Sequence, residues 1–280
     1  MTVDAITSTR NPRVRALAGL ASAGTRREQG RHLVEGPHAV AEALTAGVVE
    51  ELLVVADADL VLPPVPAEVR VTHLAPHVLE RLADTTTPQG VLAVCRTPQA
   101  TLEDVVGTGA LVVLHAVADP GNAGTILRTA DAAGAAGVVL TDGSVDPYGP
   151  KALRAAAGST YHLPVVTGVD FPAVLAACRA RGQRVLGLDG NATTSVFVLE
   201  IDDAPVALVL GNEAHGLPAE VAAELDGTVA VPLYGRAESL NVAAAAAIAI
   251  YAAARSRAAR QTAPIPPAVA PGAGSGPGDG

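Results

Sequence analysis

The sequence predicts an α/β protein in which a small α/β domain precedes a larger domain built on a mostly parallel sheet. Short apolar runs alternate with segments of helical periodicity over most of the 280 residues. Strands and helices that alternate in this way form parallel sheets covered by helices. Because 49% of the residues are hydrophobic and only 2% are aromatic, the core must be built from Ala, Val and Leu.

The first domain is expected at residues 1–97. The pattern predicts strands at residues 31–35, 48–56 and 90–95, and helices at residues 38–46 and 73–82. Gly36 and Pro37 mark the turn after the first strand, and Gly47 ends the first helix. A linker over residues 98–109 joins this domain to the next.

The start of the first domain carries the positive charge of an otherwise acidic chain. The formal net charge is −9, but residues 1–36 hold six arginines against three acidic residues. Arginine forms forked contacts with phosphate, so these residues are candidates for RNA binding, although a solvated charge run is an equally good interpretation of the charge alone. The six are Arg10, Arg13, Arg15, Arg26, Arg27 and Arg31.

The second domain is expected at residues 110–261. A buried strand at 110–117 leads into ADPGNAGTILRTADAAG, where Asn122 is the expected N-cap and Gly134 the end of a helix. On the polar side of this helix Arg128 has a simple structural alternative, an i, i+3 ion pair with Asp131. Further strands and helices alternate at residues 138–140, 151–157, 165–166, 171–181, 185–188 and 206–210. The tail, residues 262–280, is rich in proline and glycine and is expected to be disordered.

Two unusual loops, LVLGNEAHGL and VPLYGRAESLNVAAAAAIAIY, follow one another between residues 208 and 251. Each leaves an apolar strand, at 207–210 and at 229–233, and a glycine then allows the backbone to turn or to approach a ligand closely. The second loop enters a helix expected to run to about Arg260. Together the loops contain more polar chemistry than turns need, namely Glu213, Glu238, Ser239 and Asn241. We interpret them as a ligand pocket.

Several classes of function are disfavoured. The longest apolar run, residues 242–254, is too short to cross a bilayer, and the N-terminus lacks the apolar core of a signal peptide, so a cytoplasmic protein is expected. Cys95 and Cys178 are expected to be buried thiols, and the scattered histidines predict no metal site. No strand is followed by a dinucleotide-binding or Walker glycine pattern.

Three stretches in order, DPGNAGTILRTADAAG, LVLGNEAHGL and VPLYGRAESLNVAAAAAIAIY, resemble the three motifs of the SpoU (TrmH-type) RNA ribose 2′-O-methyltransferases. The resemblance covers residues 111 to about 255. Residues 8–96, with RHLVEGPHAVAEAL and TPQGVLAV, resemble the substrate-binding domain of the ribosomal RNA branch of that family. The resemblance implies a trefoil knot in the C-terminal part, which is one of the rare exceptions to unknotted folds, and a homodimer.

The resemblance also implies a cofactor, S-adenosylmethionine, bound in the knot chiefly by backbone groups. By motif position the cofactor contacts are Leu210, Gly211, Leu217, Val231, Leu233 and Leu240. The polar residues carried over from the motifs, as catalytic candidates, are Asn122, Arg128, Glu213, Ser239 and Asn241. The third motif of the family often has a serine where this chain has Ala243.

Within this resemblance Arg128 has two candidate roles, as the base that takes the 2′-hydroxyl proton or as a cation that holds phosphate and stabilises developing negative charge. A guanidinium remains charged at ordinary pH, which favours the second. The first domain favours methylation of ribosomal RNA, most specifically 23S ribosomal RNA. The alternatives are a transfer-RNA 2′-O-methyltransferase and a non-catalytic RNA-binding assembly factor, which the intact motif residues disfavour.

Overall fold

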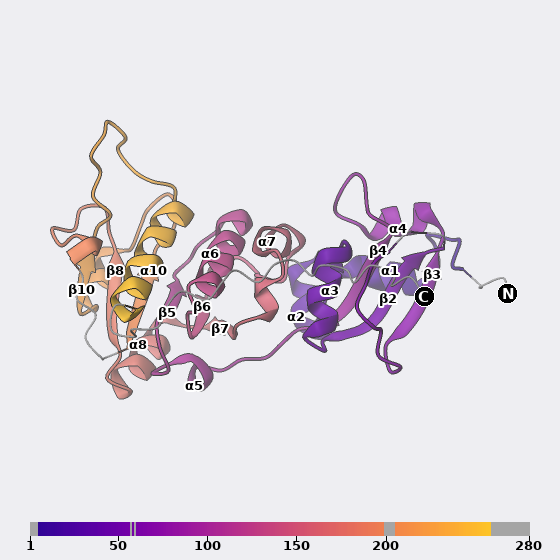
Figure 1. Cartoon of the computed structure of the whole chain (residues 1–280), viewed down its shortest axis with the longest axis horizontal. Coiled ribbons are helices and arrows are strands. Elements are labelled where there is room, and N and C mark those ends of the chain that lie inside the picture. The colour runs from indigo at the N-terminus through magenta and orange to yellow at the C-terminus, as the bar shows by residue number, and fades with distance from the viewer. Residues whose placement is uncertain (1–4, 57, 59, 199–204, 259–280) are drawn as a thin grey trace, which may run out of the picture.

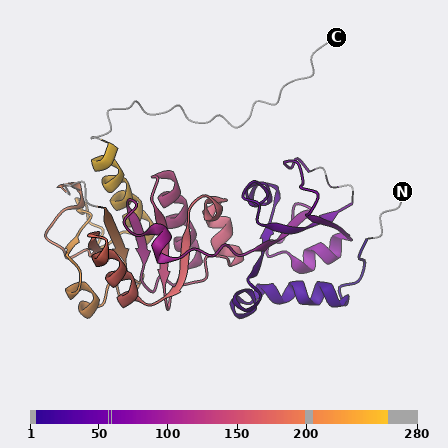
Figure 2. The ribbon, with the colours of Figure 1, turned by 90° about the horizontal axis from the view of Figure 1, so that it is seen from below.

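The computed structural model describes residues 5–56, 58, 60–198 and 205–258, and it contains a four-stranded and a six-stranded sheet (Figure 1). The predicted disordered tail lies outside the described residues. Figure 2 shows the two parts side by side, with the chain crossing between them as an extended segment before the short helix α5 (Leu102–Val105). Two α/β parts, the second with a parallel sheet, agree with the predicted fold class.

The N-terminal sheet has the strand order β1-β4-β2-β3, from strands β1 (Arg31–Glu35), β2 (Val49–Val55), β3 (Arg70–Leu74) and β4 (Val91–Arg96). The β1–β4 and β4–β2 pairs are antiparallel and β2–β3 is parallel. Two helices follow strands β1 and β3, namely α3 (Pro37–Thr45) and α4 (Pro76–Leu82). The predicted helix at 73–82 was wrong at its start, because residues 70–74 pair with β2 and Pro76 occupies the first helical turn.

The basic N-terminal segment is helical. Asn11 accepts a hydrogen bond from the backbone of Arg13 and caps α1 (Pro12–Ala18), which continues through the short 3₁₀ turn η1 (Gly19–Ala21) to α2 (Ala23–Gln29). These helices were missing from the sequence prediction. Val14 and Leu20 are buried with residues of α4 in one apolar cluster, so the segment is part of the folded domain.

The C-terminal sheet is entirely parallel among the described strands, with the order β10-β8-β9-β5-β6-β7. Its strands are β5 (Leu111–Leu114), β6 (Gly137–Thr141), β7 (Val165–Val169), β8 (Arg184–Leu188), β9 (Val206–Leu210) and β10 (Gly227–Val229). Every residue of the central strands β5 and β9 is buried, as expected for a sheet with both faces covered. The strand predicted at 229–233 was wrong in its bounds, because residues 231–233 leave the sheet.

Helices cover both faces of this sheet. On one face lie α6 (Pro120–Ala132), α7 (Pro150–Ala156) and α10 (Val242–Ala258), with Ile126, Ala156 and Ala246 in one core cluster. On the other lie α5, α8 (Phe171–Ala180) and α9 (Ala219–Ala223). The alternation of β5 side chains between the two clusters follows from the two-residue period of a strand. The remaining 3₁₀ turns are η2 (Ser159–Tyr161) and η3 (Val196–Val198).

Helices α6 and α7 pack closely because Gly124 presents no side chain. A Cβ atom at Gly124 would lie 2.3 Å from the carbonyl oxygen of Ala152 and 2.7 Å from the Cβ of Ala155. Leu153, on another side of α7, is buried in the apolar cluster of the N-terminal sheet. Helix α7 therefore contacts both parts of the chain and connects the N-terminal part to α6.

Polar groups reinforce the contact between the two parts. Arg26 is 6% exposed, and its guanidinium pairs with Asp146 at 2.7 Å while Nη1 donates to the carbonyls of Leu20 and Ala21. His162 lies between Glu42 and Asp131, with ring-nitrogen distances of 3.0 and 2.8 Å. These pairs join α2 and α3 to the second part of the chain.

His32 lies fully buried at the same junction and supplies a test of it. Its ring contacts Thr97 Oγ1 at 3.1 Å and Tyr161 Oη at 2.8 Å. Burial lowers the pKa of His32 to about 4, the negative charge of Asp146 raises it and the positive charge of Arg26 lowers it further. The imidazole is therefore neutral in the folded protein at neutral pH.

The stability of the fold should consequently fall in mild acid. Above pH 6.5 neither state protonates His32, but below it the unfolded chain binds a proton that the folded protein excludes down to pH about 4. The free energy of unfolding should drop by about 3 kcal/mol more over this interval in the wild type than in His32→Gln. Denaturant titrations at several pH values measure this. His38→Gln, at an exposed position, is the control, and parallel pH profiles for wild type and His32→Gln would contradict the prediction.

No helix in the described part of the chain is long and apolar enough to cross a membrane.

Candidate active site

A hollow of about 830 Å³ lies beyond the carboxyl ends of β8 and β9, the edge at which open α/β sheets bind ligands. Its volume, which includes space open to solvent, is in the range of roughly 300–1,000 Å³ typical of ligand pockets. Both unusual loops of the sequence contribute to its walls. Five of the six predicted cofactor contacts line it: Leu210, Gly211, Val231, Leu233 and Leu240.

Leu217 is the exception among the predicted contacts. It is absent from the lining, and its Cδ1 lies against Gly187 of β8, where it packs with the core cluster on the α8 face. Its backbone nitrogen, however, is one of the atoms closest to Gly211. Leu217 therefore contacts the wall of the pocket through its backbone, beside Gly211, and not through its side chain.

Gly211 permits a close approach between two backbone segments. A Cβ atom at this position would lie 2.3 Å from the carbonyl carbon and oxygen of Gly216. Asn212 and Gly216 exchange two backbone hydrogen bonds, at 3.0 and 2.8 Å, which close the loop into a tight ring. Gly216 has a φ of +66°, a conformation that glycine adopts without strain. The first loop is therefore a rigid wall of the hollow.

The second loop offers backbone donors to the hollow. Among the described residues, the backbone amides of Val231, Leu233 and Leu240 make no hydrogen bond with another part of the chain. The side chains of Leu233 and Leu240 are 42% and 39% exposed. Free amides beside apolar side chains suit a ligand that has a flat ring with hydrogen-bonding edges.

Three side chains from three separate motifs form a hydrogen-bonded chain at the edge of the hollow. Asn122 Nδ2 donates to Glu213 Oε1 at 3.0 Å, and Asn241 Nδ2 donates to Asn122 Oδ1 at 3.1 Å. Because the Glu213 carboxylate accepts only, Asn122 must present its amide nitrogen to it and its oxygen to Asn241. The Asn241 oxygen then accepts from the backbone of Ala243 and Ala244. One carboxylate thus sets the orientation of both amides.

Glu213 also holds the loop that precedes α6. Its carboxylate accepts backbone hydrogen bonds from Ala118 and Asp119 at 3.1 and 3.0 Å. Burial alone would raise the pKa of Glu213, but the hydrogen bonds from Asn122, Ala118 and Asp119 outweigh it, so the pKa is lowered. Glu213 is therefore ionised at neutral pH and fully engaged, which suits a positioning role.

Asp119, and not Asn122, caps α6. The Asp119 side chain accepts from the backbone of Asn122 at 2.9 Å, so the predicted N-cap was wrong by three residues. Lys151, the only lysine of the chain, reaches Asp119 from the start of α7 at 2.8 Å. The lysine hydrogen bond and the helix backbone lower the pKa of Asp119. Capping by Asp119 leaves the Asn122 side chain free to bind Glu213.

Arg128 and Ser239 lie apart from this hydrogen-bonded chain. Arg128 is exposed on α6, does not line the hollow, and makes no hydrogen bond or ion pair among the described residues. The alternative i, i+3 pair is not formed, because Asp131 contacts His162 instead. Ser239 lines the hollow and is exposed. Helix α10 is capped by Asn241 and not by Ser239.

The sequence motifs do not mark every residue of the site. Asp189 and Gly190 follow β8 directly and line the hollow, and they could have been found from the rule that carboxyl ends of neighbouring parallel strands converge. Ala116 was also missed. It has a φ of +55°, rare for a residue with a side chain, and its carbonyl accepts from Asn212 Nδ2 at 2.9 Å. No sequence signal marks that strain.

The six arginines of the first domain divide into two groups. Arg13 pairs with the buried Glu51, Arg26 with Asp146 and Arg31 with Glu50. The second group, Arg10, Arg15 and Arg27, has no acidic partner among the described residues. The set predicted as one RNA-binding arm is thus split by the fold, and half of it serves internal contacts.

The cysteines are free and buried, as predicted. Burial raises the pKa of Cys178 to about 11. In the described ranges no group of three or more His, Cys, Asp or Glu residues is placed to hold a metal ion.

The sequence of this chain is similar to known protein families and proteins. Residues 109–251 match the SpoU rRNA Methylase family, and residues 11–93 match the MRM3-like substrate binding domain. The chain is 38% identical over 244 residues to the 23S rRNA (guanosine(2553)-2′-O)-methyltransferase RlmP of Bacillus subtilis, covering 86% of this chain and 95% of the relative.

Solved structures of similar proteins include two with bound cofactor. The SpoU methyltransferase AviRb from Streptomyces viridochromogenes, in complex with the cofactor AdoMet, superposes with a TM-score of 0.80 at 32% identity, covering 89% of this chain and 99% of that one. An AdoMet-bound rRNA methyltransferase from Sinorhizobium meliloti gives a TM-score of 0.80 at 29% identity, covering 90% of this chain and 98% of that one.

Proposed function

This chain belongs to the SpoU rRNA methylase family, and from that premise we propose that it transfers a methyl group from S-adenosylmethionine to a ribose 2′-hydroxyl of 23S ribosomal RNA. The observation that carries the proposal is the chain Glu213–Asn122–Asn241, which joins all three motifs at the rim of the hollow. The ribosomal substrate is favoured over transfer RNA because the N-terminal part matches a substrate-binding domain and the relative RlmP is named for 23S rRNA.

The hollow fits the methyl donor. Its lining contains apolar side chains beside backbone amides that make no hydrogen bond among the described residues. At Gly211 the absence of a side chain lets the backbone approach that of Gly216 closely. We assign Leu210, Gly211, Val231, Leu233 and Leu240 to the cofactor, with Leu217 acting through its backbone. When bound, S-adenosylmethionine supplies an electrophilic methyl group on a sulfonium. The half-buried carboxylate of Asp189 lines the same hollow and provides negative charge for that cation.

The protein residues then orient the ribose and stabilise charge. Glu213 fixes Asn122 and Asn241 so that the loop before α6 and the start of α10 keep one geometry, and such positioning is the largest expected contribution to the rate. Ser239 lines the hollow, is exposed and is assigned to the target nucleotide. Arg128, whose guanidinium has no hydrogen-bond or ion-pair partner in the described part of the chain, is assigned to the phosphate and the developing oxyanion.

We further propose that the enzyme works as a homodimer. Arg128 lies outside the hollow of its own chain and is unpaired among the residues that the structure describes, so a partner subunit would bring it to a second site. Helix α10 supports this proposal, because its residues 242–254 are all apolar, yet Ala244, Ile248 and Tyr251 form a stripe at helical spacing that is exposed or only partly buried. Tyr251 is 52% exposed and Tyr234 is 87% exposed. Such apolar surface is typical of a protein contact.

Substitution of Tyr251 tests the dimer. Tyr251→Glu places a charge in the exposed stripe of α10 and should shift the protein from dimer to monomer, with loss of methyl transfer. Size-exclusion chromatography with light scattering measures the state. The control is Val61→Glu, since Val61 is 89% exposed in the N-terminal part. A Tyr251→Glu protein that remains dimeric, or a wild type that is monomeric at micromolar concentration, would refute the assignment of this face.

The domains and the knot are assigned from the family resemblance. We assign residues 1–97 to RNA binding, 98–109 to the linker and 110–261 to methyl transfer, although α5 within the linker packs against the second part. The two loops at 211–218 and 231–241 are the segments we assign to a trefoil knot. A cytoplasmic location, where ribosomal RNA is found, completes the proposal.

The function is tested by mapping ribose methylation on 23S ribosomal RNA from cells with and without this protein. One nucleotide should lose its 2′-O-methyl group in the deletion strain and regain it with the purified enzyme and S-adenosylmethionine. Parallel maps of 16S ribosomal and transfer RNA provide the comparison. A site that changes only in transfer RNA, or no change in any RNA, would overturn the proposal.

A further inference from the structure

We propose that Arg10, Arg15 and Arg81, together with Thr9, form a binding site for RNA phosphates at the end of the molecule remote from the cofactor pocket. This inference rests on the proposed function for its ligand class. It assigns the RNA phosphate contact to one cluster that includes Arg81, which lies outside the basic N-terminal segment. It also removes Arg13, Arg26 and Arg31 from the residues predicted to bind RNA.

The three arginines line one hollow. Its walls are Thr9, Arg10, Val14, Arg15, Ala18 and Arg81, and none of these residues carries a negative charge. Arg10 and Arg81 make no side-chain hydrogen bond or ion pair among the described residues. Arg15 uses only its Nε, which donates to the carbonyl of Arg10 at 3.2 Å, and its two terminal nitrogens remain available. Three neighbouring cations that have no counter-ion within the described ranges fit a phosphodiester ligand.

The backbone around the cluster is fixed by the fold. Ile6 forms a parallel bridge with Leu74 at the end of β3, and His77 of α4 contacts the carbonyl of Thr7 at 2.9 Å. Asn11 caps the helix that carries Arg15. Arg81 lies in the last turn of α4, and α4 packs against α1 through Val14 and Val78 in one buried cluster. A site held in place before the ligand arrives spends less conformational entropy on binding.

The other basic residues of the segment are unavailable or lie elsewhere. The three paired arginines bind Glu51, Asp146 and Glu50, and releasing Arg26 would leave the buried end of an ion pair without a partner. Arg27 is exposed but lines a different hollow, next to Asp142 and Asp146. Ion pairs within the fold therefore exclude Arg13, Arg26 and Arg31 from the RNA-binding cluster, and its position in a different hollow excludes Arg27.

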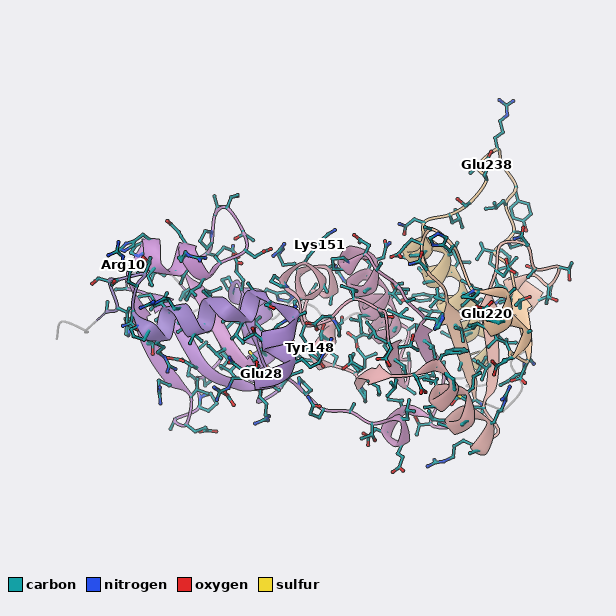
Figure 3. The ribbon with its side chains drawn as sticks, turned by 180° about the vertical axis from the view of Figure 1, so that it is seen from behind. Arg10, Glu28, Tyr148, Lys151, Glu220 and Glu238 are labelled. Atoms are coloured by element: carbon teal, nitrogen blue, oxygen red, sulfur yellow. The ribbon has the colours of Figure 1, made fainter. Side chains whose placement is uncertain are left out.

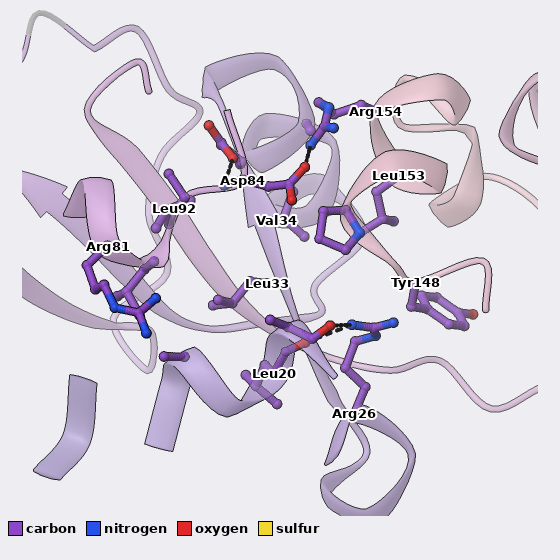
Figure 4. Close-up of a pocket in the computed structure, with 17 residues that line it drawn as sticks. Leu20, Arg26, Leu33, Val34, Arg81, Asp84, Leu92, Tyr148, Leu153 and Arg154 are labelled. Atoms are coloured by element: carbon purple, nitrogen blue, oxygen red, sulfur yellow. Dashed lines mark hydrogen bonds and ion pairs between the residues drawn. The ribbon is translucent and has the colours of Figure 1, made fainter. Parts of the chain in front are cut away.

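The cluster lies far from the cofactor pocket, at the outer end of the N-terminal part. Figure 3 places Arg10 and Glu238, a residue of the cofactor loop, at opposite ends of the molecule. Arg81 also lines the adjoining hollow of Figure 4, which runs to Tyr148 and Arg154 at the junction. RNA held at the arginine cluster must therefore extend along the molecule to reach the methyl donor. The cluster should affect binding of RNA and not the chemical step.

The test compares the salt dependence of RNA binding between two triple variants. Arg10→Gln/Arg15→Gln/Arg81→Gln removes the cluster, and Arg179→Gln/Arg181→Gln/Arg184→Gln removes the same charge from exposed positions at the end of α8 and the start of β8. The probe is a fluorescein-labelled single-stranded RNA of mixed sequence, followed by anisotropy at several salt concentrations. Three lost phosphate contacts should reduce the log–log slope by about 2. The control variant should keep the wild-type slope.

Two further readouts separate the possible outcomes. Arg81→Gln alone should reduce the slope by about 0.7, and it breaks no side-chain hydrogen bond or ion pair among the described residues. With 23S ribosomal RNA as substrate, the cluster variant should raise KM and leave kcat unchanged. An unchanged slope in the cluster variant, or an equal loss in both triple variants, overturns the site even if the enzyme methylates RNA. A wild type that binds RNA with the expected slope but never methylates it overturns the proposed function and leaves the site intact.

Discussion

An Arg128→Ala variant is expected to fold, to bind S-adenosylmethionine as the wild type does, and to lose methyl transfer by roughly 10²–10⁴-fold in kcat. Folding and cofactor binding should be unaffected because the Arg128 side chain is exposed, makes no hydrogen bond or ion pair with the described residues and does not line the cofactor hollow. The reaction should suffer because the 2′-oxygen develops negative charge that a guanidinium stabilises. Single-turnover methylation with labelled S-adenosylmethionine and 23S ribosomal RNA measures the loss.

A conservative variant distinguishes the two roles of this residue. Arg128→Lys keeps one positive charge but loses the forked geometry that binds phosphate at two points. A strong loss in Arg128→Lys favours forked positioning, whereas near wild-type activity refutes any need for the guanidinium. Arg184→Ala, at an exposed position at the amino end of β8, opposite the end that lines the hollow, should retain full activity. Full activity in Arg128→Ala would remove Arg128 from the site.

A Gly211→Ala variant should lose cofactor binding and at least roughly 100-fold of its methyl-transfer rate. The added Cβ would lie 2.3 Å from the backbone of Gly216 and 2.5 Å from the Leu217 nitrogen. Those atoms cannot move aside easily, because two hydrogen bonds between Asn212 and Gly216 close the loop. The wall of the hollow must therefore shift, and isothermal titration with S-adenosylmethionine should show it as a loss of affinity.

The matched control for Gly211 is the same substitution at a glycine with space around it. Gly24 lies in α2, and a Cβ there would meet only Ser22 Oγ at an ordinary 3.7 Å. Gly24→Ala should keep cofactor affinity and slightly favour the helix. Normal cofactor affinity in Gly211→Ala would mean that the loop adapts, and the close backbone approach would no longer explain the glycine.

The regular elements of the second domain were predictable because their signals are local. The apolar runs that became β5, β8 and β9 and the helices α6, α7 and α8 were each expected within a few residues of their bounds. The burial of Cys95 and Cys178 was also predicted from their apolar neighbours in sequence. Local patterns failed at 70–74, which forms a strand by pairing with β2, and at residues 12–29, which form helices whose first part packs against α4. Both outcomes depend on partners that are distant in sequence.

The candidate site was predictable in its residue types and motif order. The glycine, glutamate and asparagine positions stand out in the sequence, and the resemblance to a known family supplies their expected roles. Their connections were not predictable, since Asn122, Glu213 and Asn241 are separated by 28 to 119 residues. Asp119 took the capping role expected of Asn122, and only the contact with Glu213 explains why the Asn122 side chain is used elsewhere.

The sequence by itself determined the fold class, the order of the motifs and the chemical character of the pocket, because periodicity, glycine positions and residue types act over short stretches of chain. Only the tertiary structure decided which charged groups are free to meet a ligand. Six arginines near the N-terminus are equivalent in sequence, but Glu51, Asp146 and Glu50 neutralise three of them, while Arg81 joins two of the others from α4. The physical reason is that the availability of a charge depends on its neighbours in space, and folding brings those neighbours from distant parts of the chain.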